Sequence, residues 1–346
     1  MRSITVLLGA TVASAAILAA APPASADAAQ DEAWCAGGAS ITPEMRIGGC
    51  SAIISAGEES PEHLARAFVR RGAARLVKGD KAGALADFNE AIRLNPSDAH
   101  AFNSRGGAQT DVVLAMDDFD EAIRLDPSYA RAFYNRGVAW LAHGHADSAI
   151  ADFSQALQLN FNDARVYHDR AAAYFAKGDY DHALADYGEA IRLDPNLAAS
   201  FYGRGLARYE KGELDEAIAD YDEAVRLNPN YGAAIGARCW ARAIAGKALD
   251  LALADCDQAI KLDPGRGLHF GQRGVVLYRL GRFSEAAKDE DLALSLDSSN
   301  AEYLYVLGAA KQRMGQTTDG AADLASASSA DPEVASKVAQ WGVTKP

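Results

Sequence analysis

The sequence predicts an all-α protein built as a tandem array of helical hairpins. An eleven-residue phrase, "ADFNEAIRLNP" in the copy that ends at Pro96, returns at intervals that are mostly 34 residues. A second phrase, such as "AFYNRGVAW", precedes each copy by about 25 residues, and a turn centred on glycine lies between most of the pairs. Because one hairpin cannot bury its apolar face alone, the copies must stack into a solenoid.

The first 26 residues have the features of a secretion signal. Arg2 is the only charged residue among them, an apolar run covers residues 4–21, and Ala24-Ser25-Ala26 follows as small residues that a signal peptidase reads. A second possible cleavage site lies after Ala28. An uncleaved membrane anchor is the alternative, since 18 apolar residues can just span a bilayer. We therefore expect an exported protein, periplasmic or secreted, with no integral membrane segment after cleavage.

The charge balance excludes some classes of partner. The chain has 346 residues, with 34 Lys and Arg against 47 Asp and Glu and a formal net charge of −13. Binding to nucleic acid or to anionic lipid draws mainly on clustered basic residues, so neither partner is expected.

The four cysteines predict two disulfides. An even number in an exported chain favours disulfides over free thiols, and the spacing suggests the pairs Cys35–Cys50 and Cys239–Cys256. We expect residues 27–64 to form an N-terminal coil followed by a helix over residues 43–56, with the Cys35–Cys50 bond joining the two.

Helical spacing is clear within each copy of the repeat. Phe133, Gly137 and Trp140 fall on one face of the first helix of the third copy, and the second helix repeats this pattern with Ala, Phe and Ala. The proline after most second helices ends the helix.

A 34-residue hairpin with these aromatic, Gly, Ala and Pro positions resembles the tetratricopeptide repeat. The resemblance covers residues 65–332 in about eight copies, and it implies a right-handed superhelical solenoid. Residues 333–346 would then hold a capping helix and a tail. The resemblance and the style of the signal also suggest a bacterial source.

Some copies depart from the pattern. The second is three residues short and lacks the glycine turn, the third ends at Phe161 instead of proline, and the seventh has Glu290 where an aromatic residue is expected. The sixth has Cys239 in place of the small glycine and Cys256 in place of the aromatic residue. A disulfide between its two helices explains both changes, whereas a pair of buried free cysteines is the alternative.

Seven copies share an Arg on the first helix and an Asp on the second, such as Arg136 with Asp152 and Arg204 with Asp220. This recurrence predicts ion pairs across or between hairpins. Since seven copies of an active site are implausible, the pairs are expected to be architectural.

No sequence motif of an enzyme, a metal site or a cofactor site stands out. His143 and His145 have side chains that can coordinate a metal. They fall in the turn between two helices, however, and an exposed, solvated turn is the preferred interpretation. His168 and Asp169 are adjacent on a helix and diverge by about 100°, so they cannot pair with each other. We expect no catalytic residue, no metal and no cofactor.

Binding is therefore expected on a surface. In the family that the chain resembles, first helices line a concave groove, and Tyr134, His168 and Tyr202 occupy corresponding positions on three successive first helices. Such rings can grip an extended peptide, or they can pack between neighbouring helices, and both interpretations stay open. Four further aromatic residues are candidates for the same groove: Phe175, Tyr209, Trp240 and Tyr305.

The sequence favours a non-catalytic scaffold in a bacterial envelope that holds a segment of another protein in its groove. Two alternatives remain. One is a module that binds or modifies cell-wall polysaccharide, which would need a pair of carboxylates facing the groove. The other is a structural protein that assembles with itself. The sequence does not identify the partner or the oligomeric state.

Overall fold

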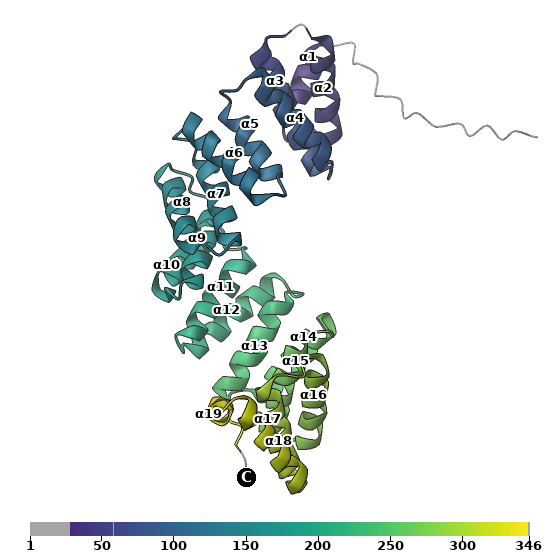
Figure 1. Ribbon diagram of the computed structural model, residues 1–346, viewed down its shortest axis with the longest axis vertical. Helices are drawn as coiled ribbons and strands as arrows, with labels where there is room; N and C mark the ends of the chain where they lie inside the picture. The colour runs from purple at the N-terminus through teal and green to yellow at the C-terminus, as the bar shows by residue number, and fades with distance from the viewer. Residues whose placement is uncertain (1–27, 58, 345–346) are drawn as a thin grey trace, which may run out of the picture. The chain divides into compact units, whose positions relative to one another are not determined.

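The computed structural model describes residues 28–57 and 59–344, and the regular secondary structure of these residues is entirely α-helical. Nineteen helices follow one another in the described ranges, and consecutive helices pair as antiparallel hairpins (Figure 1). The all-α prediction is confirmed. None of these helices is long and apolar enough to cross a membrane. The predicted signal peptide lies outside the described residues.

The chain up to Pro127 forms a first compact unit of three hairpins. Its helices are α1 (Ala28–Ala36), α2 (Pro43–Ala56), α3 (Pro61–Val77), α4 (Lys81–Leu94), α5 (Ala99–Ala108) and α6 (Val112–Leu125).

Helix α1 corrects the sequence analysis, which expected coil there. It packs on α2 and forms a ninth hairpin ahead of the eight predicted ones. Alanine-rich residues favour the helix, and the predicted Cys35–Cys50 disulfide joins it to α2. The short second copy of the repeat is accommodated by α5, which has only ten residues. Asp111 then caps α6 without a glycine turn before it.

The chain from Ser128 onward forms a second compact unit. Its helices are α7 (Ala130–Ala142), α8 (Ala146–Gln158), α9 (Ala164–Ala176), α10 (Tyr180–Leu193), α11 (Ala198–Glu210), α12 (Leu214–Leu227), α13 (Gly232–Ala245), α14 (Leu249–Leu262), α15 (Gly267–Arg279), α16 (Phe283–Leu296), α17 (Ala301–Arg313), α18 (Thr317–Ala330) and α19 (Val334–Gln340).

The turn inside a hairpin depends on a glycine and a cap. Gly79 has φ of 80°, a left-handed conformation that glycine adopts without strain, and its amide donates to the Leu76 carbonyl at 2.9 Å. The Asp80 side chain then accepts a 2.9 Å hydrogen bond from the Gly83 amide and starts the second helix.

The two helices of a hairpin meet where an aromatic ring lies on a glycine. A Cβ atom at Gly137 would fall 2.7 Å from the ring of Phe153, so no larger residue fits there without movement of the ring. Three other hairpins repeat this contact, with Gly72 and Phe88, Gly106 and Phe119, and Gly205 and Tyr221.

The predicted Arg–Asp pairs are confirmed as contacts within hairpins. Arg170 donates from Nε and Nη2 to the buried Asp186 carboxylate at 2.7 and 2.8 Å, and from Nη1 to Ser154 of the preceding hairpin at 3.0 Å. A buried carboxylate is thus paired, and successive hairpins are linked. The seven pairs are Arg71–Asp87, Arg105–Asp118, Arg136–Asp152, Arg170–Asp186, Arg204–Asp220, Arg238–Asp255 and Arg273–Asp289.

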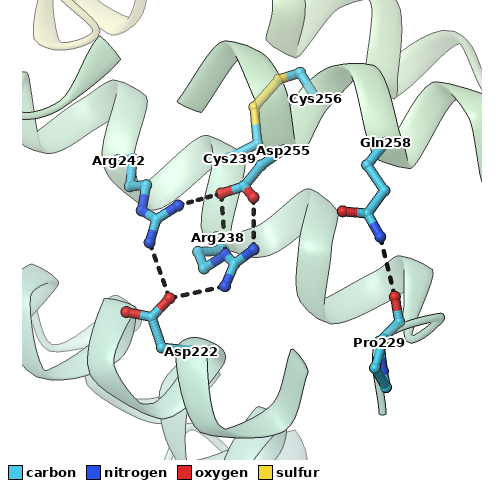
Figure 2. Close-up of polar contacts among 8 residues, drawn as sticks. All are labelled: Asp222, Pro229, Arg238, Cys239, Arg242, Asp255, Cys256 and Gln258. Carbon is cyan, nitrogen blue, oxygen red and sulfur yellow. Dashed lines mark hydrogen bonds and ion pairs between the residues drawn. A yellow bond between two sulfur atoms is a disulfide. The ribbon is translucent and has the colours of Figure 1, made fainter. Parts of the chain in front are cut away.

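The sixth predicted hairpin, α13–α14, has the most elaborate version of this pairing. Arg238 and Arg242 each bridge Asp255 of the same hairpin and Asp222 of the preceding one (Figure 2). The predicted Cys239–Cys256 disulfide is also present and joins the same two helices.

Helix α19 covers the open end of the last hairpin, as predicted. Val334 and Val338 are both 0% exposed and belong to the apolar core of α15 to α18. This core is the largest hydrophobic cluster of the described residues.

Candidate binding face

The candidate site lies on the first helices of the second unit. We call the surface of α7, α9, α11, α13, α15 and α17 the first-helix face. Successive helices of this set contact one another directly. Side chains on adjacent hairpins therefore meet there, and Tyr134, His168 and Tyr202 lie on three successive helices of this face.

Tyr134 is half-buried and links two of these helices. Its hydroxyl donates a 2.8 Å hydrogen bond to Oδ2 of Asp169 on α9, and its ring centroid lies 5.9 Å from that of Phe153 and 5.6 Å from that of Phe161. Burial raises the pKa of the Asp169 carboxyl, and the Tyr134 hydrogen bond opposes that rise.

His168 and Tyr202 also make interior contacts. His168 Nδ1 lies 2.9 Å from the hydroxyl of the buried Ser200, and its ring packs against Tyr187 at 5.5 Å. Burial lowers the pKa of His168, which favours the neutral ring. Tyr202 lies 5.2 Å from Tyr231, between ring centroids. All three predicted residues therefore pack between helices, and each keeps part of its surface exposed.

The other predicted residues divide into two groups. Phe175 packs on Tyr180 at 5.5 Å, and the Tyr209 hydroxyl accepts a 2.8 Å hydrogen bond from Nε1 of Trp240. These residues are partly exposed. Tyr305 is a correction, because it is 5% exposed and packs inside the C-terminal core that α19 helps to close. It is not available to a partner.

A cavity of about 200 Å³ opens between α11, α13 and α15. Its lining includes predicted and unpredicted residues: Tyr202, Tyr209, Trp240, Arg266, Leu268 and His269. Gly236 lies here, at the position where the preceding first helices carry Tyr134, His168 and Tyr202. A Cβ atom at Gly236 would come within 3.0 Å of the His269 ring.

A second cavity, of about 260 Å³, lies between α13, α15, α17 and the end of α19. Three rings line it, Trp240, Tyr303 and Trp341, and the carboxyl groups of Glu290 and Glu302 line it as well. We call the equivalent position on successive first helices the aromatic stripe, and its members are Tyr134, His168, Tyr202, Gly236, Gly271 and Tyr305. A side chain at Gly271 would collide with Tyr303. Each glycine in the aromatic stripe is thus matched by a ring from the next first helix.

Sequence reasoning missed Arg266, Leu268, His269, Tyr303, Trp341 and both glutamates as cavity residues. One signal in the sequence could have found two of these rings. Where a first helix has glycine in place of a ring, at Gly236 or Gly271, the next first helix has a ring in place of a small residue, at His269 or Tyr303.

The histidines of the third predicted copy do not form a metal site. His143 Nδ1 lies 2.9 Å from the carbonyl of Ala139, and the His145 ring packs edge-on against Trp140. In residues 28–57 and 59–344, no group of three or more potential metal-ligating side chains is present.

Parts of the chain match family models of a helical repeat. Residues 114–164 and 198–231 match models described as "Tetratricopeptide repeat", and residues 171–212 match one described as "TPR repeat". None of these is a model of an enzyme domain. The search of curated proteins found no match.

Several solved structures share the fold. The APC/C hetero-tetramer Cut9-Hcn1 has a TM-score of 0.58 at 15% identity, with 78% of this chain and 52% of that chain covered. The pilF protein of Pseudomonas aeruginosa has a TM-score of 0.56 at 18% identity, with 61% and 97% covered. A tetratricopeptide repeat protein of Parabacteroides merdae has a TM-score of 0.51 at 17% identity, with 72% and 98% covered.

At these identities the likeness shows the fold alone. The family models identify the repeat in residues 114–164 and 171–231, and hairpins on either side of these ranges have the same type of ion pair, at Arg71–Asp87, Arg238–Asp255 and Arg273–Asp289. Residues 114–164 and 171–231 are therefore similar to tetratricopeptide repeats.

Proposed function

We propose that the protein is a non-catalytic interaction scaffold that holds a segment of another protein on its first-helix face. The observation that carries this proposal is the pair of neighbouring cavities on that face, which share Trp240, Leu268 and Gln272. Each has the size of one or two side chains. Ligand pockets for small molecules are usually larger, about 300–1,000 Å³, so side chains of a protein segment are the better fit.

We further propose that the protein works outside the cytoplasm, in a bacterial envelope. Two disulfides among the described residues support an oxidising compartment, because such bonds rarely persist in a reducing cytoplasm. The predicted signal peptide supports the same location.

The polysaccharide alternative gains one observation. Glu290 and Glu302 line the same cavity, which is the carboxyl pair that this alternative requires. Glu290 is wholly buried, however, and the cavity is small for a polymer chain. The protein scaffold therefore remains the preferred function.

An affinity capture with paired variants tests the proposal. Leu268 lies on both cavities and is 42% exposed, so Leu268→Asp should disturb the face with little loss of stability. Leu251 on α14 is 55% exposed and lines neither cavity, which makes Leu251→Asp the matched control. A triple alanine variant at Tyr134, His168 and Tyr202 would be less informative, because it would also remove interior packing.

The immobilised parent and both variants are exposed to envelope extract. We expect the same protein to be retained by the parent and by Leu251→Asp, and to be lost from Leu268→Asp. Retention by all three would place binding elsewhere and contradict the proposal. Retention of wall polymer alone by the parent would favour the polysaccharide alternative.

A further inference from the structure

Glu290 is a buried carboxyl group without a partner. Its side chain is 0% exposed, and neither Oε1 nor Oε2 has a hydrogen-bond partner among the described residues. Leaving a buried polar group unsatisfied destabilises the folded state, because the group has lost its hydrogen bonds to water. The fold does not require this, because the equivalent position in five other hairpins holds Phe or Tyr. An unsatisfied buried group of this kind calls for a specific explanation.

The local packing holds the Glu290 carboxyl beside the cavity. A side chain at Gly274 on α15 would collide with Oε1 of Glu290, so this glycine gives the carboxyl group its place between α15 and α16. Glu290 is one of the residues that line the 260 Å³ cavity, which is partly open to solvent. Glu290 thus lines a partly open cavity while both of its unsatisfied oxygens are themselves covered, so a ligand must displace the covering atoms to reach them.

The charges around this cavity favour a cation. Glu302 lines it together with Glu290, and no Lys, Arg or His side chain is among the described residues of the lining. Burial raises the pKa of Glu290 well above its usual range, and the nearby charges of Asp289 and Asp291 raise it further. The carboxyl group therefore tends to keep its proton, and a cation that reached it would favour release of that proton and supply the positive charge that the lining does not.

The rings favour the same kind of ligand. Trp240 and Trp341 meet edge to face with centroids 5.0 Å apart, and Tyr303 completes the aromatic part of the lining. Aromatic faces attract cations, most strongly when both are shielded from water. Val275 and Val306 add apolar surface that suits an alkyl chain.

We propose that this cavity binds a primary alkylammonium group, presented as the lysine side chain of a bound protein segment. The ammonium group carries N–H donors for Oε1 and Oε2 of Glu290, which a quaternary ammonium lacks. The inference rests on the proposed function, since it names one anchor of the segment that the first-helix face would hold.

Small probes test the cavity without the natural partner. The full chain is titrated with n-butylammonium chloride, and 1-butanol and sodium chloride serve as neutral and ionic controls. Binding is followed by calorimetry and by tryptophan fluorescence, to which Trp240 and Trp341 contribute. A capped pentapeptide with a central lysine between glycines is compared with the same peptide carrying norleucine, a neutral side chain of similar shape.

Three variants assign the binding to Glu290. Glu290→Leu and Glu290→Gln remove the carboxylate, and Asp250→Asn removes an exposed carboxylate from α14, outside the lining of the cavity, as the control. We expect saturable binding of butylammonium and of the lysine peptide to the parent and to Asp250→Asn, and at least a tenfold loss of affinity in both Glu290 variants. If Glu290→Leu does not fold, Glu290→Gln decides.

Other outcomes overturn the proposal. Absence of saturable binding to the parent, or equal binding by Glu290→Gln, would rule out the ammonium site. Binding of butylammonium without binding of the lysine peptide would identify a free-amine site and remove the link to a protein segment. The probe titrations need no natural partner. Their result can therefore be interpreted even if the capture experiment with Leu268→Asp fails.

Discussion

The hydroxyl of Tyr134 donates a 2.8 Å hydrogen bond to Oδ2 of Asp169 on the first helix of the next hairpin. Tyr134, a residue predicted to face a partner, thus also links one hairpin to the next by a hydrogen bond. Tyr134, His168 and Tyr202 each have one part of their surface against the interior and another part exposed. Substitutions at these three positions will therefore affect stability as well as the binding that we propose for this face.

Tyr134→Phe should destabilise the second unit by about 1–2 kcal/mol at neutral pH, because it leaves the largely buried Asp169 carboxylate without this donor. Urea denaturation of parent and variant measures the effect. Tyr180→Phe is the control, since the Tyr180 ring packs on Phe175 and its hydroxyl has no hydrogen-bond partner among the described residues. Equal losses in the two variants would show that the Tyr134 hydrogen bond contributes nothing.

Arg170→Met should cost about 2–4 kcal/mol, because it leaves the buried Asp186 carboxylate without its guanidinium partner. The comparison is Lys177→Met, which breaks an exposed pair with Asp147 and should cost less than about 1 kcal/mol. Thermal and urea denaturation give both values. If the two substitutions were equally mild, the repeated Arg–Asp pairs would not be needed for stability.

Replacing Cys239 and Cys256 together by alanine should weaken the α13–α14 hairpin by about 3 kcal/mol, through loss of the cross-link and of packing volume. Cys239→Gly combined with Cys256→Tyr imitates the Gly205 and Tyr221 contact of the preceding hairpin and should recover part of that loss. Hydrogen exchange of the α14 amides reports the local stability. Equal protection in the two double variants would mean that the glycine–aromatic contact cannot replace the disulfide.

Glu290 should make the protein less stable as the pH rises. Its pKa in the folded protein lies well above the value of about 4.3 in the unfolded chain, so between the two values the folded state holds a proton that the unfolded state has lost. Stability then falls with rising pH by up to about 1.4 kcal/mol per pH unit. The groups around it, Asp289, Asp291, Glu302 and Tyr303, add no positive charge to oppose this.

Urea denaturation of the parent and Glu290→Gln from pH 4 to pH 8 measures this dependence. The two proteins should have similar stability near pH 4, and the variant should become progressively more stable than the parent above about pH 5. A constant difference across this range would show that the carboxyl group titrates normally.

Much of the fold can be predicted from the sequence because its rules repeat. The 34-residue period, the Arg170–Asp186 type of pair and the Cys239–Cys256 disulfide follow from comparing copies of one unit, whereas the Cys35–Cys50 disulfide follows from the number and spacing of the cysteines. Tyr305 shows the limit of this approach. It has the same register as Tyr202, but it lies in the core that α19 helps to close, so its exposure depends on a neighbour that no other copy has.

The cavities could not be predicted, because their shape depends on which of two neighbouring first helices supplies the large side chain. Gly236 and Gly271 interrupt the stripe when each copy is aligned on its own, yet a ring of the following first helix, His269 or Tyr303, packs at each place. The unsatisfied state of Glu290 likewise needs all four surrounding helices to be placed, although its departure from the repeat is visible in the sequence.

The most direct test of the scaffold function is site-specific photo-crosslinking. A benzophenone amino acid is placed at Leu268 on the first-helix face or at Leu251 on α14, and each protein is irradiated in the producing cells. The account predicts a defined protein adduct from position 268 that is absent from position 251, with the crosslinked peptide of the partner lying next to a lysine. An adduct from position 251 alone, or identical adducts from both positions, would contradict it.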